Sequence, residues 1–184
     1  RDRGASIELL LDHSDDFRHG LVLLAERGED NRFAQLALAL SYPLSRRPVS
    51  SLVSVILERC PETPAGLAAR VDLEWSTGRA EVCLAHVEQL LGVIEPDHPW
   101  VVKALGAACP AHSYTGDLGQ MSEAAPRMVG HPAATDLEQI EAVTLWALGE
   151  LYGGDVDAAA SVLEGKAEVL ARGTRLAMLV RESE

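Results

Sequence analysis

Apolar residues recur every three or four positions along most of the chain, a spacing that predicts helices with one buried face. After Gly78, the apolar positions 83, 87, 90, 91 and 94 lie on one such face, and Pro96 follows them. The residue before a proline avoids helical geometry, so the helix is predicted to end there, and Pro99 is placed to begin the next one. His86 falls on the polar side of this helix and is predicted to lie at the protein surface.

A helix pair is also predicted near the C-terminal end. Thr135 is followed three residues later by Glu138, and the two together make a capping box at a helix start. Gly153-Gly154 is predicted to end this helix, because glycine accepts the left-handed conformation of a C-terminal cap, and Asp155 is predicted to cap the next one. The second helix carries the apolar residues Ala158, Ala159, Val162, Leu163, Val169 and Leu170.

Prolines and polar caps mark the earlier helices. A helix capped by Asp30 or Asn31 is predicted to end at Pro43, and a second helix is predicted from Val49 to Cys60. A further pair is predicted over residues 5–13 and 16–27, with Asp15 or Asp16 as a cap and Gly28 as the stop.

Three turns repeat at a constant interval. The positions of Gly78, Gly116 and Gly154 are equally spaced, and an aromatic residue lies two or three positions before each of them. Equal spacing of similar turns, here about 38 residues, is the signature of a repeat array. The chain is therefore predicted to be all-α, a single domain built as an α-solenoid of antiparallel helix pairs. The expected pairs cover residues 5–28, 30–61, 64–96, 99–132 and 135–172, with a C-terminal helix or tail at 174–184.

The fourth of these pairs is predicted to be irregular. Cys109-Pro110 is expected to break its first helix, and residues 111–116 are expected to form a loop. Pro126 is expected to shorten or kink the second helix, Leu118 to Met128, because a proline inside a helix costs about 3 kcal/mol. A departure from a repeat is where function often lies, and it is equally what drift in a tolerant surface segment produces.

Composition supports helices and excludes some partners. Hydrophobic residues make up 47% of the 184 residues and aromatic ones only 4%, with Ala and Leu carrying most of the apolar volume, which favours closely packed helices over sheets. The net charge is −12 and the 16 basic residues are scattered, so direct contact with nucleic acid or an acidic membrane surface is not expected.

Location is predicted from what the chain contains. No apolar stretch reaches the length of roughly 18 residues that a membrane span needs, and no signal peptide is recognised. Three cysteines, an odd number spaced widely, indicate a reducing cytoplasm rather than a disulfide framework. Because the sequence begins with Arg1, it is expected to be a fragment of a longer protein or a processed chain.

The repeats resemble a known family. The order of residues around Gly78, and the string from Trp146 to Tyr152 followed by Gly154-Asp155, are similar to tetratricopeptide repeats. The interval of about 38 exceeds the family's ~34, and looser relatives with units of about 40 residues fit better, including the helical arrays of large bacterial LuxR-type transcription regulators. Heat-type repeats remain an alternative assignment. The resemblance covers residues 30–172 and implies a concave face that binds proteins, peptides or small effectors.

Catalytic and metal-binding patterns are weak. Cys109-Pro-Ala-His112 offers one pair of ligands where a structural zinc site uses four, and no basic cluster lies beside the thiol to activate it. The glycine turns lack the lysine and the preceding strand of a phosphate loop. No catalytic residue, metal or cofactor is therefore predicted, and the chain is predicted not to be an enzyme. An enzymatic alternative would require His98, Cys109 and His112 to cluster around one cavity.

Candidate binding residues lie on the first helix of each pair, which lines the inner surface of a solenoid. Tryptophan and basic side chains at these positions are suited to anchor a peptide, although packing between neighbouring pairs is an alternative role for the tryptophans. The predicted function is a non-enzymatic protein- or peptide-binding scaffold, the regulatory part of a larger bacterial protein; the alternative is a small-molecule sensor with a pocket near residues 109–126. The candidates are Arg32, Arg70, Trp75, Trp100, Lys103 and Trp146.

Overall fold

The computed structural model describes residues 8 and 10–172, and all regular secondary structure in this part of the chain is helical. The prediction of an all-α fold is thus confirmed, whereas the predicted C-terminal helix or tail at 174–184 lies outside the described residues. The longer helices are α2 (Ser14–Glu26), α3 (Asp30–Arg46), α4 (Ser50–Arg59), α5 (Pro64–Ser76), α6 (Ala80–Val93), α7 (Trp100–Thr115), α8 (Leu118–Val129), α9 (Asp136–Tyr152) and α10 (Val156–Gly165). After a turn at Lys166, residues 167–172 are helical again.

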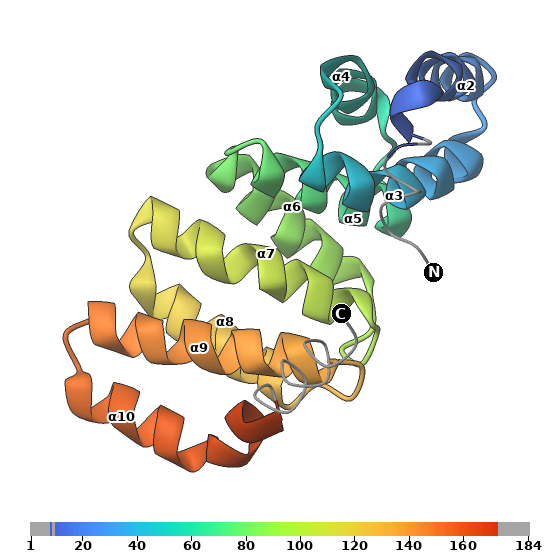
Figure 1. Cartoon of the computed structure of the whole chain (residues 1–184). Coiled ribbons are helices and arrows are strands. Elements are labelled where there is room, and N and C mark those ends of the chain that lie inside the picture. Colours follow the sequence, from blue (N-terminus) through green and yellow to red (C-terminus); the bar gives the residue numbers. More distant parts are fainter. Residues whose placement is uncertain (1–7, 9, 173–184) are drawn as a thin grey trace. The chain divides into compact units, whose positions relative to one another are not determined.

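Contacts divide the chain into two compact parts, an N-terminal half (Arg1–Val93) and a C-terminal half (Ile94–Glu184). In the N-terminal half, α5 packs on both α3 and α6, while α2 lies against α3 and α4 (Figure 1). In the C-terminal half, each helix from α7 to α10 packs on the next, and α7 also touches α9. Among the described helices, none combines the length and the apolar composition that crossing a bilayer requires.

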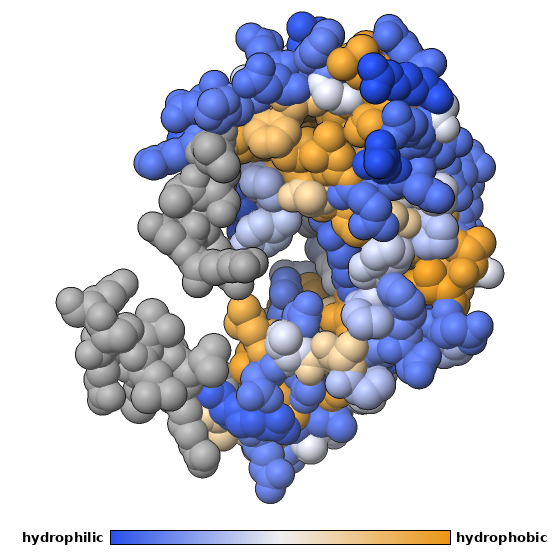
Figure 2. All heavy atoms as spheres, turned by 90° about the vertical axis from the view of Figure 1, so that its right-hand side faces the viewer, coloured by the Kyte–Doolittle hydropathy of each residue, from blue (hydrophilic) through white to orange (hydrophobic). Residues whose placement is uncertain are grey.

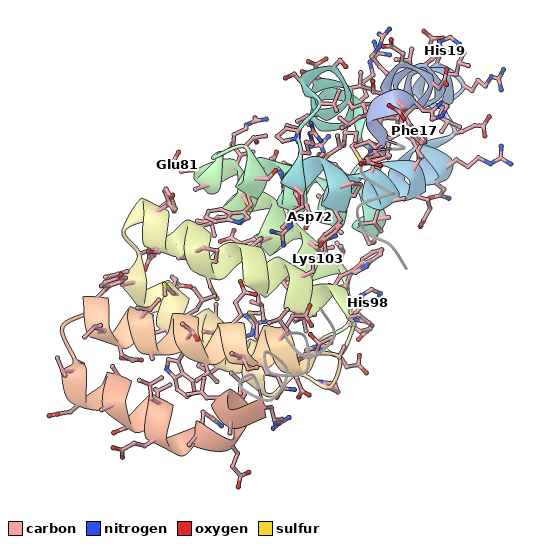
Figure 3. The ribbon with its side chains drawn as sticks, in the orientation of Figure 1. Phe17, His19, Asp72, Glu81, His98 and Lys103 are labelled. Carbon is pink, nitrogen blue, oxygen red and sulfur yellow. The ribbon has the colours of Figure 1, made fainter. Side chains whose placement is uncertain are left out.

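The two halves fill their cores differently. The N-terminal half buries large side chains from several helices, and Phe17 of α2 packs partly against this core while His19, two residues further on, points outward (Figure 3). The C-terminal half relies on alanines with two methionines, which lets helix axes approach closely. Examples from the N-terminal core are Leu21, Phe33, Leu44, Leu52, Ile56 and Leu73. Examples from the C-terminal core are Ala104, Ala108, Met121, Ala125, Met128 and Ala142.

The same turn ends four of the helices. Gly28, Gly78, Gly116 and Gly154 have φ of 65°, 75°, 82° and 92°, in the left-handed region that L side chains rarely adopt. In each turn the residue after the glycine donates its N–H to the carbonyl five residues back, as Asp155 does to Glu150 at 2.9 Å. This is the Schellman cap, which satisfies carbonyls left open at a helix end. The predicted turns are confirmed, and Gly28 adds a turn outside the regular spacing.

Helix starts follow the predicted caps in the C-terminal half. Thr135 and Glu138 form the expected capping box, and the Asp155 carboxylate accepts a bond from the Ala158 N–H at 2.8 Å. The predicted caps of the first two helices are wrong. Helix α3 begins at Asp30 itself, after Glu29, and α2 begins at Ser14, before Asp15 and Asp16; neither start has a side-chain cap.

Prolines interrupt the helices less than predicted. Helix α3 continues through Pro43 to Arg46, α7 runs through Pro110 to Thr115, and α8 contains Pro126. The predicted break at Cys109-Pro110 and the loop at 111–116 are therefore wrong. Buried residues lie just after these prolines: Leu44 and Ala111 directly follow Pro43 and Pro110 and are 0% exposed, and Met128, two residues after Pro126, is 1% exposed. Their packing offsets a local penalty of about 3 kcal/mol for each proline.

Candidate functional site

A polar network is buried between α5 and α6 in the N-terminal half. The carboxylate of Glu74 lies 2.6 Å from Nδ1 of His86, and the two side chains are 3% and 13% exposed. Nε2 of His86 lies 3.2 Å from NH1 of Arg70, whose NH2 donates to the carbonyl of Cys60. The prediction that His86 is a surface residue is wrong, because its ring faces the buried carboxylate of Glu74 on α5. The periodicity of α6 alone does not predict this contact with another helix.

The two ring nitrogens of His86 face different partners. A guanidinium group only donates hydrogen bonds, so Nε2 of His86 accepts the bond from Arg70. In this arrangement Nδ1–H of His86 donates a hydrogen bond to the Glu74 carboxylate. His86 thus links the guanidinium group of Arg70 to the carboxylate of Glu74.

This network is suited to holding helices together rather than to catalysis. An acid–imidazole pair activates a nucleophile when the second ring nitrogen faces that nucleophile. Here the second nitrogen faces Arg70, which is unable to accept a proton. Arg70 Nε is buried and finds no hydrogen-bond partner among the described residues, so the burial of this side chain has a cost. A second polar link joins α3 to α5, where the Ser41 hydroxyl donates to Asp72 at 2.7 Å (Asp72 is labelled in Figure 3).

The three thiols are buried, with exposures of 0 to 2%, and none forms a disulfide. Burial raises the pKa of Cys60 to about 11 and the pKa of Cys83 and Cys109 to about 12, because a thiolate is poorly solvated in an apolar interior. Each thiol is consequently neutral and weakly nucleophilic near pH 7. The described residues contain no group of three histidines, cysteines or carboxylates that could hold a metal ion.

The predicted binding residues lie in different environments. In the N-terminal half, Arg70 belongs to the buried network, Trp75 lies half-buried on α5, and Arg32 is exposed on α3, where it pairs with Glu29 at 2.6 Å. Arg32 also lines an open hollow of about 480 Å³ at the α2–α3 turn, together with Gly28, Glu29, Asp30, Asn31 and Thr63. Two carboxylates in this hollow offset the charge of the arginine.

The predicted residues of the C-terminal half lie on α7 and α9. Trp100, the first residue of α7, meets the ring of His98 edge-on at a centroid distance of 4.7 Å. Lys103 is half-buried on α7 and has an interaction partner of its own. Trp146 of α9 donates its indole N–H to Glu150 at 3.2 Å. These tryptophans are thus engaged within their own half of the chain.

Large exposed apolar side chains gather in the C-terminal half instead. Among the described residues, six of nine such side chains belong to it, and α9, α10 and their connecting turn hold five of the six. The sequence pattern does not predict this surface: Leu163 belongs to the apolar set predicted for its helix, yet it is 43% exposed. Polar side chains make up most of the face shown in Figure 2, with apolar patches among them. The five are Leu137, Leu151, Tyr152, Val156 and Leu163.

Comparison with known proteins adds no assignment: no family model, no curated protein and no solved structure matches the chain.

Proposed function

We propose that the chain is a stack of antiparallel helix pairs of the tetratricopeptide-like kind, and that it serves as a non-enzymatic scaffold that binds a protein or peptide. In this proposal it is the regulatory part of a larger bacterial protein. The left-handed glycine turns at Gly78, Gly116 and Gly154, which recur at a constant interval, support the repeat architecture.

The observation that carries the proposal is the apolar surface of α9 and α10. Single exposed hydrophobic residues are normal on a protein surface, but a gathering of them on two adjacent elements marks a contact site. Val156 is 63% exposed, Tyr152 61% and Leu163 43%. Tyrosine and leucine side chains of this kind supply apolar contact area when a partner covers them.

The polar groups favour a scaffold over an enzyme. His86 is hydrogen-bonded to both Glu74 and Arg70 inside the α5–α6 contact, and burial raises the pKa of the three thiols, which keeps them neutral. The alternative of a small-molecule sensor has less support, because it rests on a broken helix at residues 109–126. These residues instead lie in α7, α8 and the turn between them, where Cys109, Met121 and Ala125 are buried.

Peptide display tests the proposed function. Random peptides are selected on the immobilised protein and then measured against the variant Val156→Ser/Leu163→Ser, whose changes are both at exposed positions. Selected peptides are expected to lose affinity at least tenfold on this variant, as interface anchors commonly do. The matched control is Val82→Ser on α6, where Val82 is 38% exposed. Peptides that bind the variant as tightly as the parent protein, or a selection that yields no binder, would contradict the proposal.

A further inference from the structure

We infer that the exposed side of α10 binds a basic amphipathic helix. This inference rests on the proposed function and names the chemistry of the partner. Val156, Ala160 and Leu163 are exposed and follow the spacing i, i+4, i+7, so they form one apolar line along α10. The exposed Leu151 and Tyr152 lie just before the α9–α10 turn that leads to Val156.

A line of carboxylates runs beside the apolar line. Asp157 and Glu164 are one position after Val156 and Leu163, which places them about 100° further around the helix, on its outer side. Glu168 lies beyond the end of α10, in the helical stretch that begins at residue 167, and all three residues are exposed. Lys166 is the one basic residue within this stretch. The surface therefore combines an apolar line with a negatively charged border.

This border distinguishes between possible occupants. A second copy of the chain would bring its own carboxylates against these ones, and like charges placed opposite one another oppose association. The net charge of −12 adds to this repulsion at longer range. A partner with lysine or arginine beside its apolar residues would instead pair with the border.

The packing of the C-terminal half favours a helical partner. Each helix from α7 to α9 packs on the next, and among the described residues α10 is covered by α9 where Ala159 is buried, whereas Val156 on another side is exposed. Side chains at i, i+4 and i+7 form a ridge that fits the groove of a second helix. Helix-in-groove recognition uses apolar anchors with this same spacing on the partner.

The test uses two synthetic probes. The first is a fluorescein-labelled amphipathic helix of five turns with leucines at i, i+3, i+4 and i+7 and flanking lysines, and the second has glutamate at each lysine position. Fluorescence anisotropy with the full chain is expected to show at least tenfold tighter binding of the lysine probe. The variant Asp157→Asn/Glu164→Gln/Glu168→Gln is expected to weaken its binding about tenfold at low salt, because charge pairs at a rim contribute modestly and are screened.

Matched variants separate specific from general attraction. Glu58→Gln/Glu81→Gln/Glu88→Gln removes the same charge from exposed positions on α4 and α6 and is expected to leave the affinity within twofold. Val156→Ser/Leu163→Ser is expected to weaken the lysine probe at least tenfold, and circular dichroism verifies that every variant is folded. Equal losses for the two charge variants would overturn the inference.

The failure of this inference is distinguishable from that of the proposed function. If peptides selected by display need Val156 and Leu163 but carry no excess of lysine or arginine, the basic partner is overturned and the scaffold stands. If no selected peptide depends on these two residues, both proposals fall.

Discussion

The helix pairs α5–α6 and α9–α10 are each joined by the same left-handed glycine turn, at Gly78 and Gly154, and positions at the same distance from these two glycines are called equivalent below. Arg70 and Glu74 on α5 correspond to Trp146 and Glu150 on α9. In the first pair the glutamate is buried against His86, whereas in the second it is half-buried and accepts a bond from the indole of Trp146. The pair α5–α6 thus has a buried polar contact, whereas the pair α9–α10 has large apolar side chains exposed on its surface.

The chemically reactive residue types and the residues proposed to bind a partner lie on different helix pairs. The residue types that attract attention in a search for catalysis, a carboxylate, a histidine and a thiol, lie together in α5–α6, where they hold helices together. The residues proposed to bind a partner are ordinary aliphatic side chains on α10. What distinguishes them is exposure, a property of packing rather than of residue type.

The largest effect is expected from removing the buried carboxylate. Glu74→Ala leaves His86 and Arg70 without their anion in a site that is almost closed to water, so the free energy of unfolding is expected to fall by about 3 kcal/mol. Glu150→Ala, at the equivalent half-buried position on α9, is expected to cost less than about 1 kcal/mol. Urea denaturation followed by circular dichroism measures both, and equal costs would contradict a special role for the α5–α6 network.

A double variant sharpens this test. His86→Val introduces the residue that α10 has at the equivalent position, Val162. If Glu74 and His86 act as a pair, the loss for the double variant Glu74→Ala/His86→Val is expected to be about 1–3 kcal/mol smaller than the sum of the two single losses. Additive losses would show that the two side chains do not stabilise one another.

Two glycines compare packing at a helix contact with an open surface. A Cβ built on Gly149 of α9 would lie 2.6 Å from Oγ of Ser122 on α8, whereas one on Gly92 of α6 would meet nothing within 4 Å. Gly149→Ala is expected to destabilise the protein by about 1–3 kcal/mol through overpacking. Gly92→Ala is expected to stabilise it by up to about 1 kcal/mol, because alanine favours the helix. Thermal unfolding gives both signs, and stabilisation by Gly149→Ala would show that α8 and α9 separate easily.

Alkaline pH tests the buried thiols of both halves. Unfolded cysteines ionise near their ordinary pKa of 9, whereas burial raises the folded pKa of Cys60 to about 11 and of Cys83 and Cys109 to about 12. The stability from the neutral buried thiols is therefore complete below pH 9 and is lost as pH rises from 9 toward 12. Each thiol contributes a decline of up to about 1.4 kcal/mol per pH unit in this window.

The control for this pH dependence is the variant Cys60→Ala/Cys83→Ala/Cys109→Ala. Its urea midpoint is expected to be lower near neutral pH, because small cavities form, but to fall less steeply between pH 9 and 10.5 than that of the parent protein. Parallel declines would mean that other groups cause the alkaline loss.

The features that the sequence predicts correctly depend on residues close in the chain, and those that it misses depend on contacts between distant residues. The glycine turns, the Thr135 capping box and the helix from Ser50 to Arg59 depend on residues close in the chain, and the pattern predicted them. Whether helix α7 continues past Pro110 depends on the residues that Ala111 packs against, and a local sequence pattern does not identify those residues. The partner of His86 is twelve residues away on another helix, and the exposure of Leu163 depends on how α10 packs in the folded chain.

The smallest effect is expected on α10. Val156→Ser/Leu163→Ser removes apolar groups that already face solvent, so the free energy of unfolding is expected to change by less than about 0.5 kcal/mol for each substitution. Leu73→Ser on α5, where Leu73 is 0% exposed, is expected to cost several times more, because it leaves a cavity and a buried hydroxyl. Urea denaturation compares the two variants. A large loss of stability in the α10 variant would mean that Val156 and Leu163 stabilise the fold itself. That result would contradict their proposed role as a partner-binding surface.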